Sequence, residues 1–66
     1  MQVYLNDTPI SITASKLFEV LKSQALETKK GIAVAVNDEV IHRTDWETKQ
    51  LKENDRILVI TATQGG

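Results

Sequence analysis

Hydrophobic and polar residues alternate in several short stretches of this chain, and alternation with a period of two predicts β-strands. Residues 2–5 form the first stretch. Residues 6–9 are dense in turn formers, and residues 10–13 alternate again. The chain is therefore predicted to open with a β-hairpin over residues 2–13.

The pattern then changes to helical spacing. The apolar residues that gather on one side are Ala14, Leu17, Phe18, Val20, Leu21 and Ala25. Thr13 or Ser15 can cap this helix, although neither has Glu or Gln three residues later to complete a capping box. We expect one amphipathic helix of about three turns that lies on a sheet.

Three further strands are predicted in the second half of the chain. Residues 32–36 form a β-rich apolar run, residues 40–43 a short strand, and residues 56–61 the last strand. Residues 44–47 fit the capping-box pattern and predict a brief helical turn that packs Trp46 against the core. The order β-β-α-β-β-β indicates an α+β fold of the β-grasp type. We expect a mixed five-stranded sheet with the helix on one face and the last strand central, beside the first.

The length of 66 residues allows one small domain, which we expect to span residues 1–61 and to be followed by a flexible tail over residues 62–66. A hydrophobic content of 41% is enough for one compact core. It is too little for a core and a deep ligand pocket together. We therefore expect a protein that is not itself an enzyme.

Composition excludes several classes of protein. The chain has no cysteine, which excludes disulfides, cysteine-ligated metals and thiol catalysis. Eight Lys+Arg against nine Asp+Glu give a net charge of −1, so there is no basic field for nucleic acid. No secretory signal and no apolar run of membrane-spanning length is present. We expect a cytoplasmic protein that is monomeric when free and binds neither nucleic acid nor membrane.

Candidate catalytic and metal-binding side chains are few. His42 is the only histidine, and the acidic pairs at residues 38–39 and at Asp45 and Glu47 have no third ligand or pocket in the sequence pattern. Acid–base catalysis of the glycosidase type needs two carboxyl groups that face each other across a substrate cleft, and nothing in the sequence predicts one. We expect these residues to be turn, cap and surface residues, and we expect no catalytic group and no metal site.

The most informative feature is the pair Gly65-Gly66, at the last two positions of the sequence. A glycine pair within a chain marks a turn, but we expect no downstream element here for a turn to serve. The pair provides a carboxylate on a thread without side chains, which can enter a narrow channel of another protein. The alternative is an ordinary frayed terminus.

A second feature lies on the last strand, where Ile57 and Val59 share one face and Leu58 and Ile60 share the other. If the helix covers the first pair, the second pair points outward and forms an apolar patch beside the tail. The same outer face would also carry Tyr4, Ala33 and Ala35. Exposed apolar patches mark partner sites, so Leu58, Ile60 and Tyr4 are candidate partner contacts. The alternative is a strand that is buried on both faces.

These features together resemble the ubiquitin-like proteins, and within them the ThiS family of sulfur carriers for thiazole formation in thiamine biosynthesis. The residues that carry the resemblance are 35–41, Arg43, Trp46, Leu51, 54–57 and 62–66. The chain departs from the family pattern at His42, where proline is common, and at Asn54, where glycine is common. Both departures fall at loop or edge positions.

The resemblance implies a chemistry for Gly66. A ThiF-like E1 adenylyltransferase would use ATP and Mg²⁺ to adenylate its carboxylate, with Gln64 and Gly65 recognised as part of the tail. Sulfur from a persulfide, charged by a cysteine desulfurase, would then give a thiocarboxylate that a ThiG-like thiazole synthase consumes. The chain itself would bind no cofactor.

Three other hypotheses remain open. A carrier for molybdopterin or another sulfur pathway would share the fold and the tail, although such carriers are usually longer and often have a proline before the glycine pair. A protein-conjugating modifier would also end in Gly-Gly. A plain β-grasp interaction module would have an incidental tail.

Overall fold

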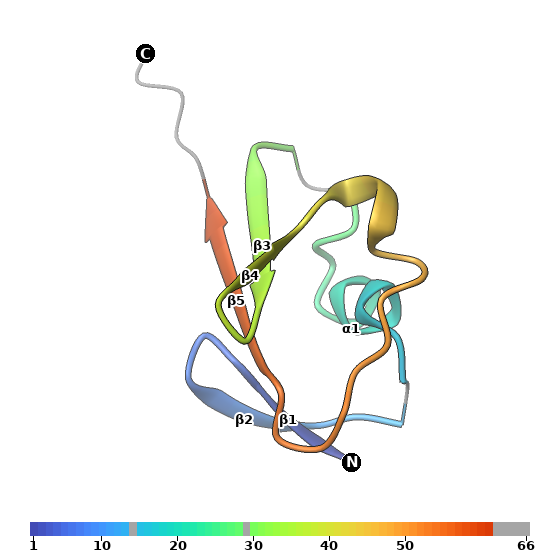
Figure 1. Ribbon diagram of the computed structural model, residues 1–66, viewed down its shortest axis with the longest axis vertical. Helices are drawn as coiled ribbons and strands as arrows, with labels where there is room; N and C mark the ends of the chain where they lie inside the picture. Colours follow the sequence, from blue (N-terminus) through green and yellow to red (C-terminus); the bar gives the residue numbers. More distant parts are fainter. Residues whose placement is uncertain (14, 29, 62–66) are drawn as a thin grey trace.

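The computed structural model describes residues 1–13, 15–28 and 30–61. Its elements are β1 (Gln2–Leu5), β2 (Thr8–Ser11), α1 (Leu17–Ser23), β3 (Ile32–Val36), β4 (Glu39–Ile41), the 3-10 helix η1 (Arg43–Asp45) and β5 (Arg56–Thr61). The strands form one five-stranded sheet in the order β2-β1-β5-β3-β4 (Figure 1). β1 runs parallel to β5, and the other pairs are antiparallel. This confirms the predicted mixed sheet with the last strand beside the first.

The first hairpin is tighter than the sequence predicts. β2 begins at Thr8, so only Asn6 and Asp7 form the turn, with φ of 49° and 69°. Two consecutive residues with positive φ are typical of the two-residue turns that match the twist of a hairpin. Pro9 lies within β2 rather than in the turn, opposite Tyr4. A proline is tolerated there because β2 is an edge strand of the sheet.

The helix is also shorter than the predicted three turns and begins without a side-chain cap. Its N-cap is Lys16, so the prediction that Thr13 or Ser15 caps the helix is wrong. Backbone carbonyls of a distant loop replace the cap. The N–H of Leu17 donates to the Lys49 carbonyl at 3.0 Å, and the N–H of Phe18 donates to the Trp46 carbonyl at 3.0 Å.

The helix ends in a left-handed residue. Ala25 has a φ of 59° and is exposed, so it does not belong to the buried side of the helix as the spacing predicts. The N–H of Leu26 donates to the Leu21 carbonyl at 2.8 Å, and the N–H of Ala25 donates to the Lys22 carbonyl at 3.0 Å. This is the hydrogen-bond pattern of a Schellman motif, which glycine usually completes. Ala14, the other predicted end of the apolar stripe, lies outside the described residues.

We expect Ala25→Gly to stabilise the protein. The left-handed conformation costs a residue with a Cβ about 1–2 kcal/mol, while glycine loses about 0.5–1 kcal/mol more backbone entropy on folding. The net gain should be about 0.5–1 kcal/mol, and urea unfolding measures it directly. Lys22→Gly is the matched control, because it lies inside the same helix and should lower the stability by a similar amount. A loss of stability in Ala25→Gly would contradict this account of the helix end.

The segment after β3 differs from the sequence prediction in its boundaries. β4 ends at Ile41, and His42 is the N-cap of η1 without a side-chain cap hydrogen bond. The predicted capping box from residue 44 to 47 therefore does not start this turn. Its predicted result still holds, because Trp46 is buried and its Nε1 donates to the Ile41 carbonyl at 3.1 Å. The Arg43 guanidinium lies 4.4 Å from the centre of the indole ring.

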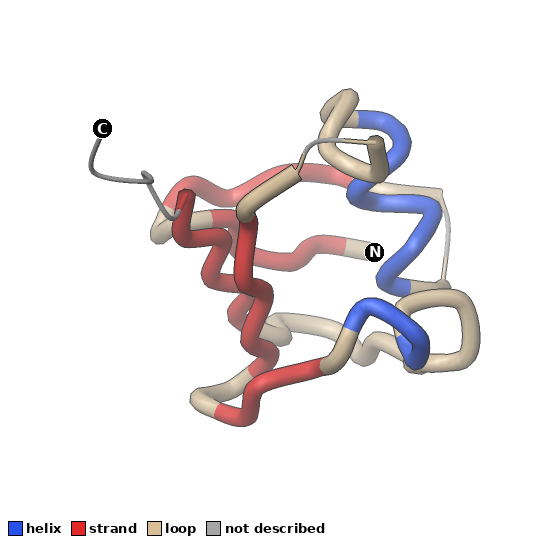
Figure 2. The backbone as a smooth tube through the Cα atoms, turned by 90° about the horizontal axis from the view of Figure 1, so that it is seen from above, coloured by secondary structure: helices blue, strands red, loops and turns tan. Residues whose placement is uncertain are grey.

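One side of the sheet carries the hydrophobic core, and Figure 2 shows the helical segments on that side. The buried core residues are Val3, Leu17, Val20, Leu21, Val34, Val36, Trp46, Leu51 and Ile57. They come from β1, α1, β3, β5 and the segment between η1 and β5, and none of them comes from β2 or β4, the two edge strands. Within the described ranges, no helix is both long and apolar enough to cross a membrane. The other face of the sheet is left uncovered by the helix, and it is the face that bears on function.

Candidate functional site

β5 places its side chains alternately toward the core and toward solvent. Ile57 is 2% exposed, whereas Leu58 is 47% and Ile60 54% exposed. Val59 is half-buried and packs against the core. The predicted outward orientation of Leu58 and Ile60 is confirmed, and the alternative of a strand buried on both faces is wrong. Two large aliphatic side chains are thus exposed to solvent just before the predicted tail.

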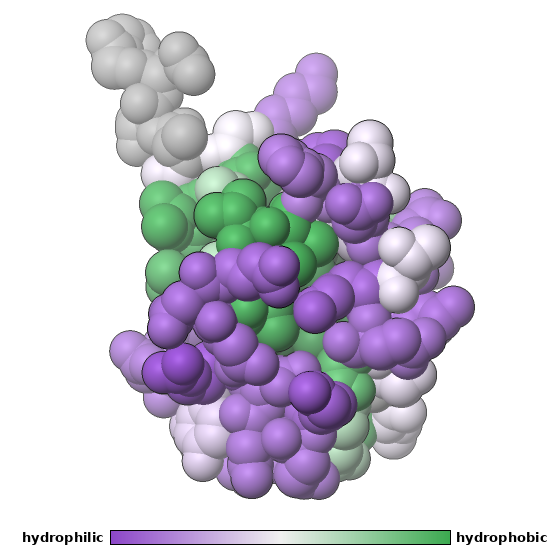
Figure 3. Space-filling view, in the orientation of Figure 1, coloured by the Kyte–Doolittle hydropathy of each residue, from purple (hydrophilic) through white to green (hydrophobic). Residues whose placement is uncertain are grey.

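Neighbouring strands extend this apolar surface. Ala35 of β3 lies between Leu58 and Val40 in the sheet register, and Ala33 lies opposite Ile60. Cross-strand partners point to the same face, so these five residues form one surface, the outer patch. Val40 is 65% exposed, and the sequence analysis did not assign it to the patch. The register of β4 against β3 was the missing information. Figure 3 shows apolar side chains gathered over the region of β3, β4 and β5.

Tyr4, the third predicted partner contact, lies at the polar end of the same face. It is half-buried and pairs with Arg56 rather than with Leu58 or Ile60. Its hydroxyl accepts a hydrogen bond of 3.3 Å from Gln2 Nε2. The Arg56 guanidinium lies 3.4 Å from the carboxylate of Asp38, and both side chains are exposed. Exposed pairs of this kind add little stability, so their effect is to give the outer patch a charged border.

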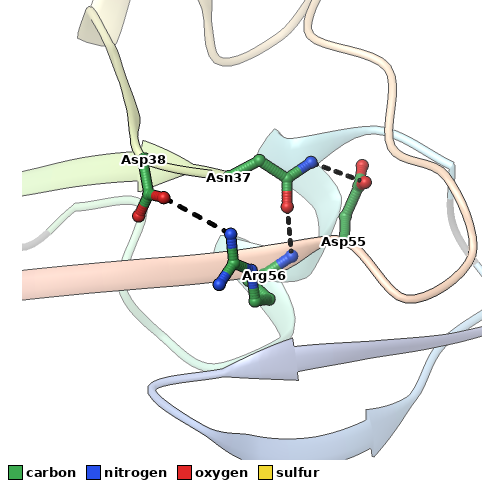
Figure 4. A network of polar contacts seen from close by, with 4 residues as sticks. All are labelled: Asn37, Asp38, Asp55 and Arg56. Atoms are coloured by element: carbon green, nitrogen blue, oxygen red, sulfur yellow. Dashed lines mark hydrogen bonds and ion pairs between the residues drawn. The ribbon is translucent and has the colours of Figure 1, made fainter.

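A buried carboxylate fixes the start of β5 (Figure 4). Asp55 is only 6% exposed, and its carboxylate accepts hydrogen bonds from Asn37 Nδ2 at 2.9 Å and from the Lys52 N–H at 2.8 Å. The side-chain oxygen of Asn37 accepts from the Arg56 N–H at 3.0 Å. No pattern in the sequence indicated this role of Asp55. The network holds Arg56, the first residue of β5, in place.

The predicted reactive residue is not within the described part of the chain. Gln64, Gly65 and Gly66 all lie outside it, so the roles assigned to them stay predictions. Thr61 is the last residue of β5 and the last one described, and it follows Ile60 of the outer patch directly. In sequence, the segment with the glycine pair therefore begins where the exposed patch ends.

The remaining candidate side chains are not part of the outer patch, and His42 and Asp45 line a surface hollow beside Val40. His42, Asp45 and Glu47 are exposed and belong to the segment between β4 and the loop before β5. The described residues contain no group of three or more His, Cys, Asp or Glu side chains that could hold a metal ion. The outer patch is thus an exposed apolar surface that lies partly on a central strand of the sheet, and such a surface suits recognition by another protein.

Comparison with known proteins connects the chain to one family. A sequence model of the ThiS family matches residues 3–66. The sulfur carrier protein ThiS of Escherichia coli is 27% identical over 66 residues, which is the full length of both chains. The sulfur carrier protein ThiS of Thermus thermophilus is 33% identical over 64 residues, or 97% of this chain and 98% of that protein.

Solved structures agree on the fold. The crystal structure of the thiamine biosynthesis protein ThiS from Geobacter metallireducens superposes with a TM-score of 0.83 at 20% identity, over the whole of both chains. The NMR structure of a thiamine biosynthesis protein from the same organism gives a TM-score of 0.70 at 22% identity. It covers all of this chain and 88% of that one. At these identities the superpositions support the β-grasp fold.

Proposed function

The chain belongs to the ThiS family, and we propose that it is a sulfur carrier for thiazole formation in thiamine biosynthesis, with the sulfur carried on Gly66. The observation that carries the proposal is the match over nearly the whole chain to relatives named sulfur carrier protein ThiS. The same match favours thiamine synthesis over the molybdopterin pathway. The terminal Gly65-Gly66 supplies the chemical group that such a carrier needs.

The proposed chemistry starts from the low reactivity of a carboxylate. A carboxylate is a poor electrophile, so an E1-like adenylyltransferase first converts the Gly66 carboxylate and ATP into an acyl-adenylate and pyrophosphate. The outer sulfur of a persulfide, supplied by a cysteine desulfurase, then attacks the adenylate carbonyl and displaces AMP, which leaves an acyl disulfide. A thiol attacks the distal sulfur of that disulfide as the two-electron reductant, which releases a Gly66 thiocarboxylate and forms a new disulfide. A thiazole synthase takes the sulfur from the thiocarboxylate. The partner enzyme handles ATP and Mg²⁺, and this chain provides the acyl group and the surface that is recognised.

We further propose that the outer patch is the surface that these enzymes bind. Leu58 and Ile60 project from the strand that leads into the tail, so a protein that covers them also meets the tail. Gly65 would pass through the partner's channel, because a residue without a side chain admits close backbone contact, and Gln64 would be recognised with it as part of the tail. Tyr4 would contact the partner at the polar border of the same face. In this proposal the free protein is a monomer, and its cytoplasmic location stays a prediction of the sequence.

The test of this function is the intact mass. After incubation with the cognate adenylyltransferase, ATP, Mg²⁺, a cysteine desulfurase and cysteine, the mass should rise by the difference between a sulfur and an oxygen atom. Fragmentation should place the change on Gly66. A parallel sample without the desulfurase controls for the sulfur source and should keep its original mass. An unchanged mass would contradict the proposal, provided that the same enzyme modifies its own known carrier.

A further inference from the structure

The pairing between β1 and β5 ends earlier than β5 does. The register pairs Tyr4 with Arg56 and Leu5 with Ile57, and β1 stops there, whereas β5 continues to Thr61. Backbone groups of a central strand need partners on both sides. Beyond Ile57, the side of β5 that faces β1 therefore needs hydrogen-bond partners that the strand β1 does not provide.

Asn6 supplies these partners from its side chain. Its backbone N–H donates to the Ile57 carbonyl at 2.8 Å. Its Oδ1 then accepts from the Val59 N–H at 2.8 Å, and its Nδ2 donates to the Val59 carbonyl at 3.3 Å. A side-chain amide carries one acceptor and donors in the same plane as a peptide does. The Asn6 side chain thus continues the β1–β5 hydrogen bonding after the main chain has turned away.

Asparagine suits both tasks at this position. Asn6 has a φ of 49° and opens the tight turn, and asparagine is among the residues that tolerate this left-handed conformation. Val59 lies between Leu58 and Ile60, the two residues that β5 contributes to the outer patch. The amide contact therefore holds β5 at the patch itself, close to the point where residues 62–66 begin.

We propose that Asn6 is a positioning residue for the reaction at Gly66. β3 pairs with one side of β5 as far as Thr61, and Asn6 restrains the other side of its distal half, so the two together fix the direction in which β5 ends. A partner that binds the patch then receives the tail in a productive orientation, so the complex loses less conformational entropy when Gly66 reaches the reacting position. This inference rests on the proposed sulfur-carrier function.

Asn37, in the turn after β3, provides a matched control because its side chain also contacts β5. It also has a left-handed φ, of 50°, and it also binds β5 through its side chain, at the Arg56 N–H at 3.0 Å (Figure 4). Asn37 acts at the start of β5, and Asn6 acts near the end. Asn6→Gly and Asn37→Gly each keep a residue that accepts positive φ and remove two side-chain hydrogen bonds, which for Asn37 include the one to the buried Asp55 carboxylate. The two variants differ in which end of β5 they release.

Hydrogen exchange of the free protein tests the restraint without any partner. In Asn6→Gly, the Val59 amide should exchange at least about tenfold faster than in the wild type, because its acceptor is removed. Amides in the β3–β5 pairing should change much less. In Asn37→Gly, the Arg56 amide should accelerate and the Val59 amide should stay protected. A Val59 amide that stays protected in Asn6→Gly would overturn the inference.

Steady-state kinetics test the positioning, with the chain as the varied substrate of the adenylyltransferase. Asn6→Gly should lower kcat about fivefold or more and leave KM within about twofold, because the outer patch still binds while fewer complexes present Gly66 correctly. Asn37→Gly should keep a kcat close to the wild type. Asn6→Asp keeps an acceptor for the Val59 N–H but loses the donor, so its kcat should lie between those of the wild type and Asn6→Gly. It provides the test if the glycine variant folds poorly.

The outcomes separate this inference from the proposed function. If the wild type is adenylated and Asn6→Gly has the same kcat, the positioning role is wrong and the carrier function stands. Equal losses in Asn6→Gly and Asn37→Gly would likewise overturn it, because general loosening of β5 would explain them. If the wild type itself is never adenylated, the proposed function fails, and the positioning role fails with it.

Discussion

Removal of Gly65 and Gly66 is expected to abolish adenylation completely while leaving the folded domain intact. The reaction needs a carboxylate at the end of a thread that fits the partner's channel, and a chain that ends at Gln64 offers that carboxylate too early and beside a larger side chain. Within the described part of the chain the buried core runs from Val3 to Ile57, so we expect the deletion to remove no core contact. The free energy of unfolding should therefore change by no more than about 0.5 kcal/mol. ATP–pyrophosphate exchange measures the first effect and thermal unfolding the second.

Extension of the chain is the complementary experiment. An alanine added after Gly66 keeps both glycines but moves the carboxylate and places a Cβ next to it, so adenylation should be lost in the same way. If the shortened chain still supports exchange, the reactive carboxylate is not that of Gly66. If the shortened chain unfolds much more easily, the terminal residues are part of the folded domain, and the division at residue 61 is wrong.

Two adjacent residues of β5 should respond in opposite ways to truncation. Ile57 is 2% exposed within the core, so Ile57→Ala should cost about 2–5 kcal/mol of stability. In a domain of this size, each 1 kcal/mol lowers the melting temperature by about 4–8 °C. Leu58 is 47% exposed, so Leu58→Ala should change the stability by no more than about 0.5 kcal/mol. Thermal unfolding of both variants measures the contrast.

Partner binding should show the reverse order. Truncation of a central interface residue commonly costs 2 kcal/mol or more, which is about a 30-fold loss of affinity. Leu58→Ala and Ile60→Ala should weaken binding to the adenylyltransferase by about this factor, as calorimetry can measure. The folded fraction of Ile57→Ala should bind almost normally. If Leu58→Ala destabilises the free protein as much as Ile57→Ala does, the outer patch is not a free surface. Unchanged affinity in both patch variants would place the partner contact elsewhere.

The sequence predicted best the strands whose apolar and polar side chains show a clear pattern over a few consecutive residues. The predicted ranges 2–5, 32–36 and 56–61 coincide with β1, β3 and β5. Alternation along a strand follows from backbone geometry alone, so it also predicted that Leu58 and Ile60 face away from Ile57. The glycine pair, and the chemistry proposed for it, are likewise visible in the sequence without any structure.

The boundaries of the helix show where local reasoning failed. Spacing of apolar residues extended the helix from Ala14 to Ala25, but the described helix runs from Leu17 to Ser23. Its first N–H groups bind carbonyls of Trp46 and Lys49, and its end is set by the left-handed Ala25. A side-chain cap was predicted because sequence offers only nearby residues as partners. The tertiary fold brought a distant backbone to the same groups.

The sequence alone thus determined the class of fold, the alternation of β5 and the terminal group, because each depends on residue type and on spacing along the chain. The tertiary structure alone decided how β5 is held. Asn6 and Val59 are 53 positions apart, and Asn37 and Asp55 are 18 apart, yet each pair is joined by a side-chain hydrogen bond. Val40 enters the outer patch through a register that no local pattern reveals. Contacts between distant residues form only when the whole sheet assembles, since the hydrogen bonds that fix them depend on which strands become neighbours.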